Sequence, residues 1–334
     1  MASVTSQASA PDVSILIVSF NTRNVLRECV ESIEREAAGL RVEISIVDNH
    51  SSDGSPEMIE QEFPHVRLLR SDTNLGFGAA NNAALEGCTG RYIVLLNSDA
   101  FLCPDSLRLA VRHMDENPKA GLAGGRLVGR DFSWQPSARM FPGILSDLSV
   151  MTGLSGRFPK SKVFGYFDRT WADQSLPSEV DWVPGAFSII RSEVLAQVGF
   201  FDPAFFLYSE EVDLCRRIQA AGYQIWYWPD ISVIHIGGES SRQVKTLEMS
   251  TTGAQLVLWR MRSTLLYYRK HHGAKAWLAK TQELALYRLT ELRNAFSKDP
   301  RRVARARESR NQAQLMRQAW KDTNGGRVSP PRPW

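Results

Sequence analysis

The chain has 334 residues, of which 43% are hydrophobic and 23% are charged, a composition that argues against a largely disordered protein. Its four cysteines, Cys29, Cys88, Cys103 and Cys215, show no CxxC pairing, which argues against a zinc module or a disulfide framework and fits a reducing compartment. The start of the chain lacks the pattern of a signal peptide, and no run of about 18 apolar residues offers a membrane span. We therefore expect a cytoplasmic protein.

The net charge of +4 conceals two regions of opposite sign. Residues 256–334 hold 18 Lys and Arg but only 5 Asp and Glu, a net charge of +13, so residues 1–255 carry −9. An acidic body that binds anions would need a metal ion, whereas a basic segment suits an anionic surface. Nucleic acid is a poorer partner because no nucleic-acid-binding motif accompanies the charge.

The first third of the chain alternates apolar, β-branched runs with helical patterns, after a polar leader over residues 1–12. This alternation predicts an α/β protein with a doubly wound, mainly parallel sheet. The predicted strands are 13–20, 42–47, 66–70 and 92–96, and the predicted helices are 23–36, one that begins near residue 56, and 79–86.

Polar side chains follow three of these strands, where each strand ends. They are Ser19 and Asn21, then Asp48, then Asn97, Ser98 and Asp99. The carboxyl ends of parallel strands meet at one edge of a sheet, which is where open α/β sheets bind ligands. We therefore expect these side chains to converge in one crevice.

A glycine-containing loop leads into the third predicted helix. Gly76 and Gly78 could let backbone N–H groups approach a phosphate, or could form a packing turn. The loop matches neither the GxGxxG nor the GxxxxGK[ST] motif.

The middle of the chain has a less regular pattern. Residues 118–142 suggest strand and loop, and residues 143–180 suggest an irregular insertion or lid that faces an acceptor. Trp182 precedes a further predicted strand, and either stacks on a sugar or is a buried structural residue.

A second cluster of ionisable groups follows. Glu210, Glu211 and Asp213 occupy the first turn of a predicted helix that Gly222 ends, where they are either helix-end charges or a general base. His235 ends another buried strand, over residues 231–236, and is either a core histidine or a metal ligand.

These motifs together resemble family 2 glycosyltransferases with the GT-A fold, of the subgroup that includes bacterial rhamnosyltransferases. The resemblance covers residues 13–242. It rests on seven motifs in the family's order, namely VSFN, VDNHSSDGS, NLGFGAANNAAL, LLNSDA, WVPGAF, FFLYSEEVDLCRR and VIHIGGESS.

The resemblance implies a nucleotide-sugar donor, a dTDP- or UDP-sugar. Ser19, Asn21 and Asp48 would line the base pocket, and Asp48 would accept the N3–H of uracil or thymine. Further residues would bound the ribose and diphosphate, namely Asn74, Gly76, Phe77 and Asn81, with Asn97, Ser98 and Asp99 at the end of the fourth strand. From the WVPGAF motif, Trp182, Gly185 and Ala186 would contact the acceptor.

The resemblance also implies a site for Mg²⁺ or Mn²⁺. Asp99 matches the last acid of the family's DxD motif, Asn97 stands where the first Asp often occurs, and His235 matches the second metal position. Oxygen and imidazole donors suit these cations. With only two protein ligands, the metal should bind weakly in the absence of nucleotide sugar.

The implied base is the second acid of the family's ED pair, here Glu211 where Asp is usual. This difference leaves Glu210 as an alternative base, with Asp213 structural or orienting the acceptor. One base without a second nucleophilic carboxylate fits single displacement with inversion at the anomeric carbon. The acceptor would be a saccharide or a lipid-linked saccharide. The alternative is a non-catalytic nucleotide-sugar-binding or scaffold protein, inactive because of Asn97 and Glu211.

We divide the chain into a leader (1–12), a GT-A domain (13–255), a basic amphipathic helical extension (256–320) and a flexible tail (321–334). The extension could place the protein on the inner face of the cytoplasmic membrane. It could equally pack on the GT-A domain or on a second subunit, as in a homo-oligomer.

Overall fold

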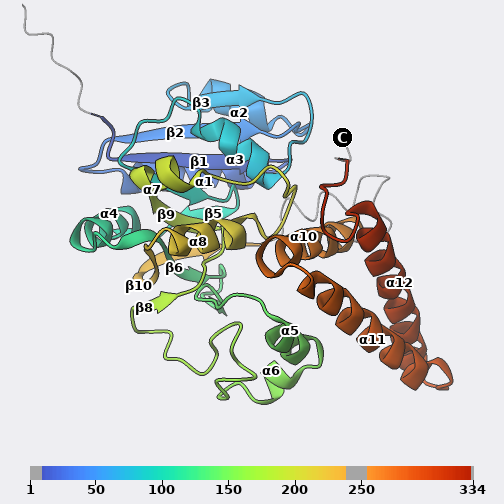
Figure 1. Ribbon diagram of the computed structural model, residues 1–334. Coiled ribbons are helices and arrows are strands. Elements are labelled where there is room, and N and C mark those ends of the chain that lie inside the picture. The colour runs from blue at the N-terminus through green and yellow to red at the C-terminus, as the bar shows by residue number, and fades with distance from the viewer. Residues whose placement is uncertain (1–9, 238–253, 332–334) are drawn as a thin grey trace, which may run out of the picture.

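The computed structural model describes residues 10–237 and 254–331 (Figure 1). The centre of the described chain is a ten-stranded sheet in the order β3-β2-β1-β4-β9-β6-β10-β5, with β7 beside β6 and β8 beside β10. The strands are β1 (Val13–Ser19), β2 (Val42–Asp48), β3 (Arg67–Arg70), β4 (Tyr92–Leu96), β5 (Ala100–Leu102), β6 (Ala120–Val128), β7 (Trp134–Gln135), β8 (Ser178–Val180), β9 (Phe187–Arg191) and β10 (Gln224–His235).

The first four strands of the chain, β1 to β4, form the parallel half of the sheet. β1 pairs in parallel with β2 and β4, and β2 pairs in parallel with β3, whereas β9 runs antiparallel to both β4 and β6. The sheet is therefore mixed, and the predicted parallel order of the first four strands is confirmed. Predicted strand 231–236 is part of a longer strand, β10, which pairs with β6 across an irregularity between Trp228 and Ser232.

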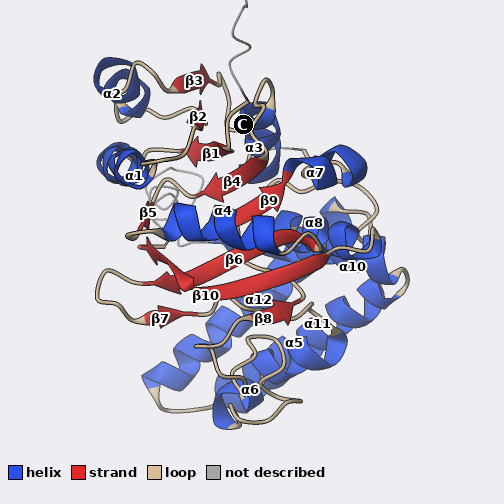
Figure 2. Ribbon diagram, turned by 90° about the vertical axis from the view of Figure 1, so that its left-hand side faces the viewer, coloured by secondary structure: helices blue, strands red, loops and turns tan. Residues whose placement is uncertain are grey.

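Helices cover both faces of the sheet (Figure 2). The described helices are α1 (Arg23–Glu36), α2 (Ser55–Glu62), α3 (Phe77–Leu85), α4 (Ser106–Glu116), α5 (Ile144–Met151), α6 (Leu154–Arg157), α7 (Ser192–Val198), α8 (Glu210–Ala220), α10 (Ala254–His272), α11 (Lys275–Ala295) and α12 (Pro300–Asp322).

Alternation along the strands produces two apolar layers. Val13, Ile15 and Ile17 of β1 pack in one layer with α1, α2 and α4, whereas Leu16 lies in the other with α3, α7, α8 and α10. Because successive side chains of a strand point to opposite faces, an apolar run such as that of β1 must be covered twice.

The segment 143–180 contains more regular structure than its sequence pattern suggests. It forms α5, the short helix α6 and strand β8. α5 packs against α11, and Tyr268 of α10 donates a hydrogen bond to Asp147 of α5 at 2.6 Å. α5 thus contacts the C-terminal helices, and that the segment faces an acceptor stays a prediction.

The C-terminal helices form a group beside the sheet (Figure 1). α10 packs on the sheet domain through Leu266, Tyr267 and Tyr268, while α11 and α12 lie side by side. Of the alternatives expected for the extension, α10 therefore packs on the sheet domain. Within the described ranges, no helix combines the length and apolar character needed to cross a bilayer.

The two ends of the described chain are attached to the body. Residues 1–9 of the expected leader and residues 332–334 of the expected tail lie outside the described residues. Tyr92 donates a backbone hydrogen bond to Asp12 at 3.1 Å. Arg269 of α10 donates to the carbonyl of Gly325 at 3.0 Å, and Arg262 pairs with Asp322 at 2.5 Å. The first part of the predicted flexible tail is therefore bound to α10, which corrects the prediction for residues 321–325.

Candidate active site

The carboxyl ends of β1, β2 and β4 meet at one edge of the sheet, as predicted. Ser19 at the end of β1 is directly paired with Asp48 at the end of β2, and β4 runs on the other side of β1. Asn97, Ser98 and Asp99 directly follow β4. The sheet therefore brings three polar segments together that are far apart in sequence.

Asp48 has one carboxylate oxygen bonded and one without a partner. Its Oδ2 accepts the backbone N–H of Ser51 at 2.9 Å, while Oδ1 is buried and has no hydrogen-bond partner among the described residues. Burial raises the pKa of Asp48, although the Ser51 contacts lower it. An unpaired acceptor in a buried position is costly unless a ligand supplies a donor.

The residues around Asp48 hold the loop in place. The side chain of Asn21 accepts the N–H of Ser52 at 2.7 Å, and its backbone N–H donates to the hydroxyl of Ser51 at 2.9 Å. Ser19 is fully buried, with its hydroxyl 3.0 Å from that of Thr22. Of the three residues predicted for a base pocket, Asp48 thus has the unpaired polar atom, whereas Ser19 and Asn21 bond to neighbouring residues of the chain.

Asn49 organises the glycine-containing loop. Its side chain donates to Asn74 Oδ1 at 3.0 Å and accepts the N–H of Leu75 at 2.7 Å. Gly76 has a φ of 81°, and a Cβ there would collide with the carbonyl oxygen of Phe206. Gly76 is therefore required by close packing, which was the alternative to phosphate approach. Asn49 was not among the predicted site residues, although its position after Asp48 was a signal.

Phe77 links three parts of the site. Its backbone N–H donates to the carbonyl of Phe206 at 2.9 Å, and its ring lies against Gly185, where an added Cβ would approach the ring to 3.1 Å. Asn81, which is buried, donates to the carbonyl of Phe77 at 3.0 Å. Phe77, which follows the glycine-containing loop, therefore contacts both the WVPGAF loop and the segment before α8.

Asp99 and His235 lie close enough to share a cation. Asp99 Oδ1 is 3.5 Å from His235 Nε2, and β5 and β10, the strands next to them, are paired. Adjacent ligands of a six-coordinate cation with bonds of about 2.1 Å lie about 3 Å apart. Desolvation lowers the pKa of His235 although Asp99 opposes the shift, which favours the neutral imidazole that metals bind.

Gln135 fixes the orientation of His235. Its amide nitrogen donates to the backbone carbonyl of His235 at 2.8 Å, which places its Oε1 3.0 Å from His235 Nδ1. Because Oε1 is an acceptor, Nδ1 carries the proton and Nε2 presents a lone pair toward Asp99 and the Asn97 amide, 3.5 Å away. The residues present therefore fit a divalent cation.

The metal site contains few protein ligands. Among the described residues, no group of three or more His, Cys, Asp and Glu side chains could hold a metal ion. Asn97 contacts the WVPGAF loop instead, since its backbone N–H donates to Ala186 at 3.1 Å. The cation would need oxygen ligands from a bound nucleotide or from water.

Glu210, which is buried, and Glu211, which is half-buried, are adjacent at the start of α8. Each has one carboxylate oxygen that is buried without a hydrogen-bond partner among the described residues. Burial raises the pKa of both, the charge of Glu211 raises that of Glu210 further, and the Arg139 guanidinium opposes the rise at Glu211. Burial thus favours the protonated form of Glu210, and favours that of Glu211 less strongly.

The turn before this pair has a strained backbone. Tyr208 and Ser209 have φ values of 73° and 69°, a conformation that costs free energy for non-glycine residues and is frequent at functional sites. α10 supports the turn, since Ser263 donates to the carbonyl of Leu207 at 2.7 Å and Trp259 packs against Phe206 with ring centroids 4.5 Å apart.

Asp213 differs from the two glutamates. It is fully buried, and it is contacted by Arg217 at 2.8 Å and by Lys270 and His271 of α10 at 2.7 Å each. Although burial opposes it, these contacts lower the pKa of Asp213 to about 2. A carboxylate held by two cationic side chains, Arg217 and Lys270, and by the imidazole of His271 is a poor base, so the structure favours the structural role for Asp213 rather than the catalytic one.

Trp182 is a structural residue. It is only 7% exposed, its indole N–H donates to the carbonyl of Met140 at 2.9 Å, and its ring packs near Phe167. The ring therefore has no face open to a sugar. This corrects the prediction that Trp182 contacts the acceptor, while Gly185 and Ala186 do lie beside the predicted donor residues.

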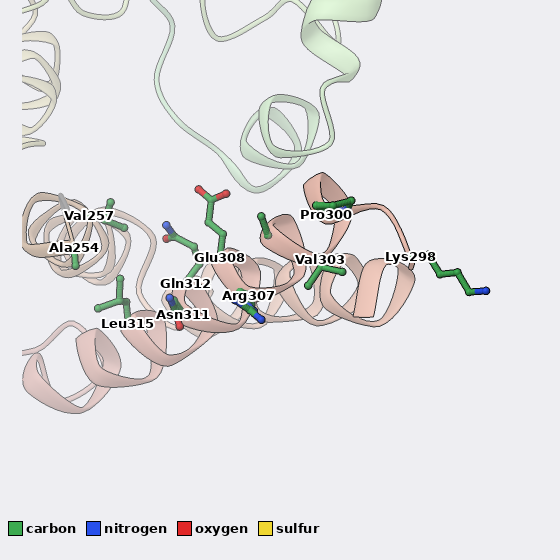
Figure 3. A pocket seen from close by; sticks show the side chains of 11 residues that line it. Ala254, Val257, Lys298, Pro300, Val303, Arg307, Glu308, Asn311, Gln312 and Leu315 are labelled. Carbon is green, nitrogen blue, oxygen red and sulfur yellow. The ribbon is translucent and has the colours of Figure 1, made fainter. Parts of the chain in front are cut away.

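A cavity of about 720 Å³ lies elsewhere, between α10 and α12 (Figure 3). Val257, Val303 and Leu315 contribute apolar lining, and Arg307 and Gln312 contribute polar groups. None of the predicted donor, metal or base residues lines it. The candidate site therefore rests on converging side chains at the sheet edge.

Comparison with known sequences decides the family. The family model described as Glycosyl transferase family 2 matches residues 14–213, which include the donor loop, Asp99 and the Glu210–Glu211 pair. The chain belongs to glycosyl transferase family 2. This confirms the predicted family.

Two curated relatives of this family 2 chain are rhamnosyltransferases by name. One is the N-acetylglucosaminyl-diphospho-decaprenol L-rhamnosyltransferase of Mycobacterium tuberculosis, 31% identical over 209 residues, which span 58% of this chain and 66% of the relative. The other is rhamnosyltransferase WbbL of Escherichia coli, 24% identical over 268 residues, 76% of this chain and 92% of the relative. The alignment thus covers just under two thirds of the mycobacterial relative.

A solved structure supports the fold. The mannosyltransferase PcManGT from Pyrobaculum calidifontis, in complex with GDP-Man and Mn²⁺, aligns with a TM-score of 0.55 and 15% identity, over 94% of this chain and 88% of that chain. The fold of this family 2 chain is the GT-A fold, as predicted.

Proposed function

We propose that this family 2 protein is an inverting, metal-dependent glycosyltransferase. It moves a sugar from a nucleotide-sugar donor to a hydroxyl of a saccharide or polyprenyl-linked saccharide, in the synthesis of a bacterial surface polysaccharide. The observation that carries the proposal is the convergence of three groups at one sheet edge. These groups are the Asp48 carboxylate, whose Oδ1 has no partner among the described residues, the Asp99–His235 pair and the Glu210–Glu211 pair. The glutamates lie beside the glycine-containing loop, since a Cβ added at Gly78 would lie 3.8 Å from Glu210 Cβ. We take residues 13–255 as the catalytic domain and 256–320 as its helical extension.

The proposed donor site follows from Asp48 and the loop after it. Asp48 Oδ1 accepts the N3–H of a uracil or thymine ring, which satisfies its unpaired, buried oxygen. Asn74, Gly76, Phe77 and Asn81 bound the sugar and diphosphate, held in place by Asn49.

Asp99 and His235 would hold Mg²⁺ or Mn²⁺ between them, with Ser98 beside Asp99 at the end of β4 and Gln135 holding the His235 ring. The cation, when bound, supplies charge neutralisation for the departing nucleoside diphosphate. The side-chain amide of Asn97 donates toward His235, so Asn97 acts as a neighbour of the metal pair rather than as a second carboxylate ligand.

The proposed base is Glu211, with Glu210 as the alternative. A carboxylate in a buried site is a stronger base than one in water, and the Arg139 guanidinium keeps Glu211 more readily ionised than burial alone would allow. Glu211 takes the proton of the acceptor hydroxyl as its oxygen attacks the anomeric carbon. Because no second carboxylate attacks the sugar, the reaction inverts the anomeric configuration.

The names of the relatives support a finer proposal. Both are rhamnosyltransferases, and the mycobacterial one is named for a polyprenyl-diphosphate-linked N-acetylglucosamine. We propose L-rhamnose from dTDP-rhamnose as the donor sugar and a polyprenyl-linked acceptor, with the protein at the inner face of the cytoplasmic membrane.

A transfer assay tests this proposal. The purified chain is incubated with dTDP-rhamnose and a panel of UDP-sugars, with Mn²⁺ or with EDTA, and with a polyprenyl-diphosphate-linked N-acetylglucosamine acceptor. We expect a metal-dependent product with one donor. Nucleotide binding without turnover of any donor would instead indicate a non-catalytic nucleotide-sugar-binding protein. An Asp48→Asn variant should bind dTDP at least tenfold more weakly, because a carboxylate acceptor is replaced by a neutral amide.

A further inference from the structure

Helix α11 has several of its large apolar side chains on the outside, although Leu284 and Tyr287 pack inward against α10 and α12. Its buried positions are mainly small or acidic residues, namely Ala276, Ala279, Glu283 and Glu291. Its exposed positions include large apolar residues, namely Trp277 at 54%, Leu278 at 44%, Leu289 at 51%, Leu292 at 65% and Phe296, just after the helix, at 92%. This is the reverse of the usual distribution for a surface helix.

The exposed residues form one stripe. Leu278, Ala285, Leu289, Leu292 and Phe296 follow one another at intervals of seven, four, three and four residues, which places them on one face of a helix. Trp277 borders that face. Such a continuous apolar stripe on a described surface calls for a partner.

Cationic residues border the apolar stripe. Lys275 and Arg293 lie along one side of it, and Lys298, Arg301 and Arg302 surround its end near Phe296. All five are exposed, and none of them forms an ion pair with another residue in the described parts of the chain. The α11–α12 pair extends away from the sheet (Figure 1), and the exposed fractions of the stripe residues show that the described chain leaves them open.

We propose that the outer face of α11, with the cationic residues around it, docks on an anionic phospholipid membrane. The apolar side chains enter the boundary between headgroups and acyl chains, and Lys275, Arg293, Lys298, Arg301 and Arg302 contact lipid phosphates. The proposal deepens the proposed function, because it names the surface that brings the site to a polyprenyl-linked acceptor.

Charge favours a membrane over a second copy of the chain. A two-fold contact through this face would bring two sets of unpaired cations together, which is unfavourable. An anionic surface neutralises them instead. The opposite charges of the two regions, −9 for residues 1–255 and +13 for residues 256–334, would also orient the protein with its C-terminal helices toward the lipid.

The apolar part of the docking surface is confined to α11 and to Phe296 just after it. α10 cannot contribute its apolar residues, because Leu258, Trp259, Leu265 and Leu266 are buried against the domain and α12. The sequence leaves two alternatives for the whole extension, membrane binding or packing on the domain. In the proposal α10 packs on the domain and α11 binds the membrane.

Vesicle sedimentation of the full chain tests the docking surface. Wild-type protein and a Leu292→Glu/Phe296→Glu variant are mixed with phosphatidylcholine vesicles that contain or lack phosphatidylglycerol. A matched control carries the same change at two other exposed apolar residues, Val163→Glu/Leu176→Glu, which are 53% and 57% exposed.

We expect wild type and the matched control to pellet with the anionic vesicles and to be released by salt, and the Leu292/Phe296 variant to partition at least tenfold less. Equal pelleting of that variant and wild type, or no pelleting of wild type, would overturn the proposal. The proposal would also be overturned if light scattering showed a dimer for wild type that the Leu292/Phe296 variant loses, while vesicle binding stays the same. The face would then bind a second copy of the chain.

The assay separates this inference from the proposed enzymatic activity. Vesicle binding needs neither donor nor metal, so it can succeed while transfer fails. If both hold, the Leu292/Phe296 variant should lose activity on vesicle-bound acceptor but keep wild-type activity on a short-chain, water-soluble acceptor. Equal loss on both acceptors would contradict a docking role.

Discussion

Gln135 contacts His235 through both of its amide atoms, although the two residues are 100 positions apart in the chain. This double contact sets both the ring orientation and the tautomer of His235. Asp99 Oδ1 then faces the lone pair of Nε2 at 3.5 Å. The metal pair that we propose, Asp99 and His235, therefore depends on a third residue, Gln135, which lies in β7 at the margin of the sheet.

Replacing Gln135 should weaken metal binding. In Gln135→Leu the imidazole loses its acceptor at Nδ1, so we expect the affinity for Mn²⁺, measured by electron paramagnetic resonance with dTDP present, to fall tenfold to a hundredfold. Gln135→Glu keeps an acceptor at that position and should retain most of the affinity. Unchanged binding in Gln135→Leu would show that His235 needs no orienting residue or does not bind the metal.

For single residues, the sequence predicts the candidate reactive side chains better than it predicts the residues that hold them in place. Asp48, Asp99, His235, Glu210 and Glu211 stand at strand or helix ends, where side-chain type and position already suggest a role. Their supporting residues, Asn49 and Gln135, are ordinary amides whose function depends on contacts across the sheet. Trp182 shows the opposite error, because an aromatic residue beside a predicted site is as easily a core residue as a sugar contact.

Helix α10 carries the support for the candidate base. It holds the strained turn before α8 through Ser263 and Trp259, and it fixes α8 itself through Lys270 and His271, which contact Asp213. The position of Glu210 and Glu211 thus depends on a helix outside the part of the chain that the family model matches.

Asp213→Asn should therefore affect stability rather than the chemistry. The substitution leaves Arg217, Lys270 and His271 without their shared anion, and we expect a loss of about 2–3 kcal/mol in the free energy of unfolding at pH 7. Because the folded pKa of Asp213 is about 2, below its unfolded value, this contribution is present above pH 4 and is lost as the pH falls toward 2.

Denaturant unfolding at several pH values measures this effect, and the pH profile of transfer serves as the second readout. A structural role leaves the acid limb of the profile in place. A shift of that limb, with unchanged stability, would contradict the structural assignment of Asp213.

Helix α5 contains a buried acid with the opposite pH dependence. Burial raises the pKa of Asp147 to about 6, although the hydroxyl of Tyr268 donates to it at 2.6 Å. The folded state therefore disfavours the charged form, and stability falls as the pH rises from about 4 through 6.

Asp147→Asn should stabilise the protein at pH 8 by up to about 3 kcal/mol, because the amide keeps an acceptor for Tyr268 and carries no charge. The gain should disappear near pH 4, where wild-type Asp147 is protonated. Thermal unfolding at the two pH values measures it, and a variant that is less stable at pH 8 would contradict the prediction.

The sequence predicts the first four strands and their helices well but misses α5, for a physical reason. The first four strands and their helices have strong apolar periodicity because both faces of the sheet are covered. α5 was missed because its eight residues lie in an aromatic, glycine-rich segment and are held by contacts with α10 and α11. Short elements of this kind depend on tertiary packing more than on local pattern.

Across the whole molecule, chemistry and attachment fall to different parts of the chain. The acidic sheet domain carries the residues that we propose for the donor, the metal and the base. The basic C-terminal helices support the turn before α8 through α10 and present an apolar, cationic face on α11. The sequence reveals this division as a charge asymmetry, but it does not show which helix packs on the domain and which faces outward. Only the burial of each helix distinguishes them.

The measurement that tests the account most directly compares sugar transfer by wild type, Glu211→Gln and Glu210→Gln, with dTDP binding as a control for folding and donor affinity. We predict that Glu211→Gln lowers kcat by a factor of 10² to 10⁴ with unchanged dTDP binding, and that Glu210→Gln retains more activity. A wild-type kcat in Glu211→Gln would contradict the role of Glu211 as the base, and no transfer by wild type with any donor would contradict the proposed activity.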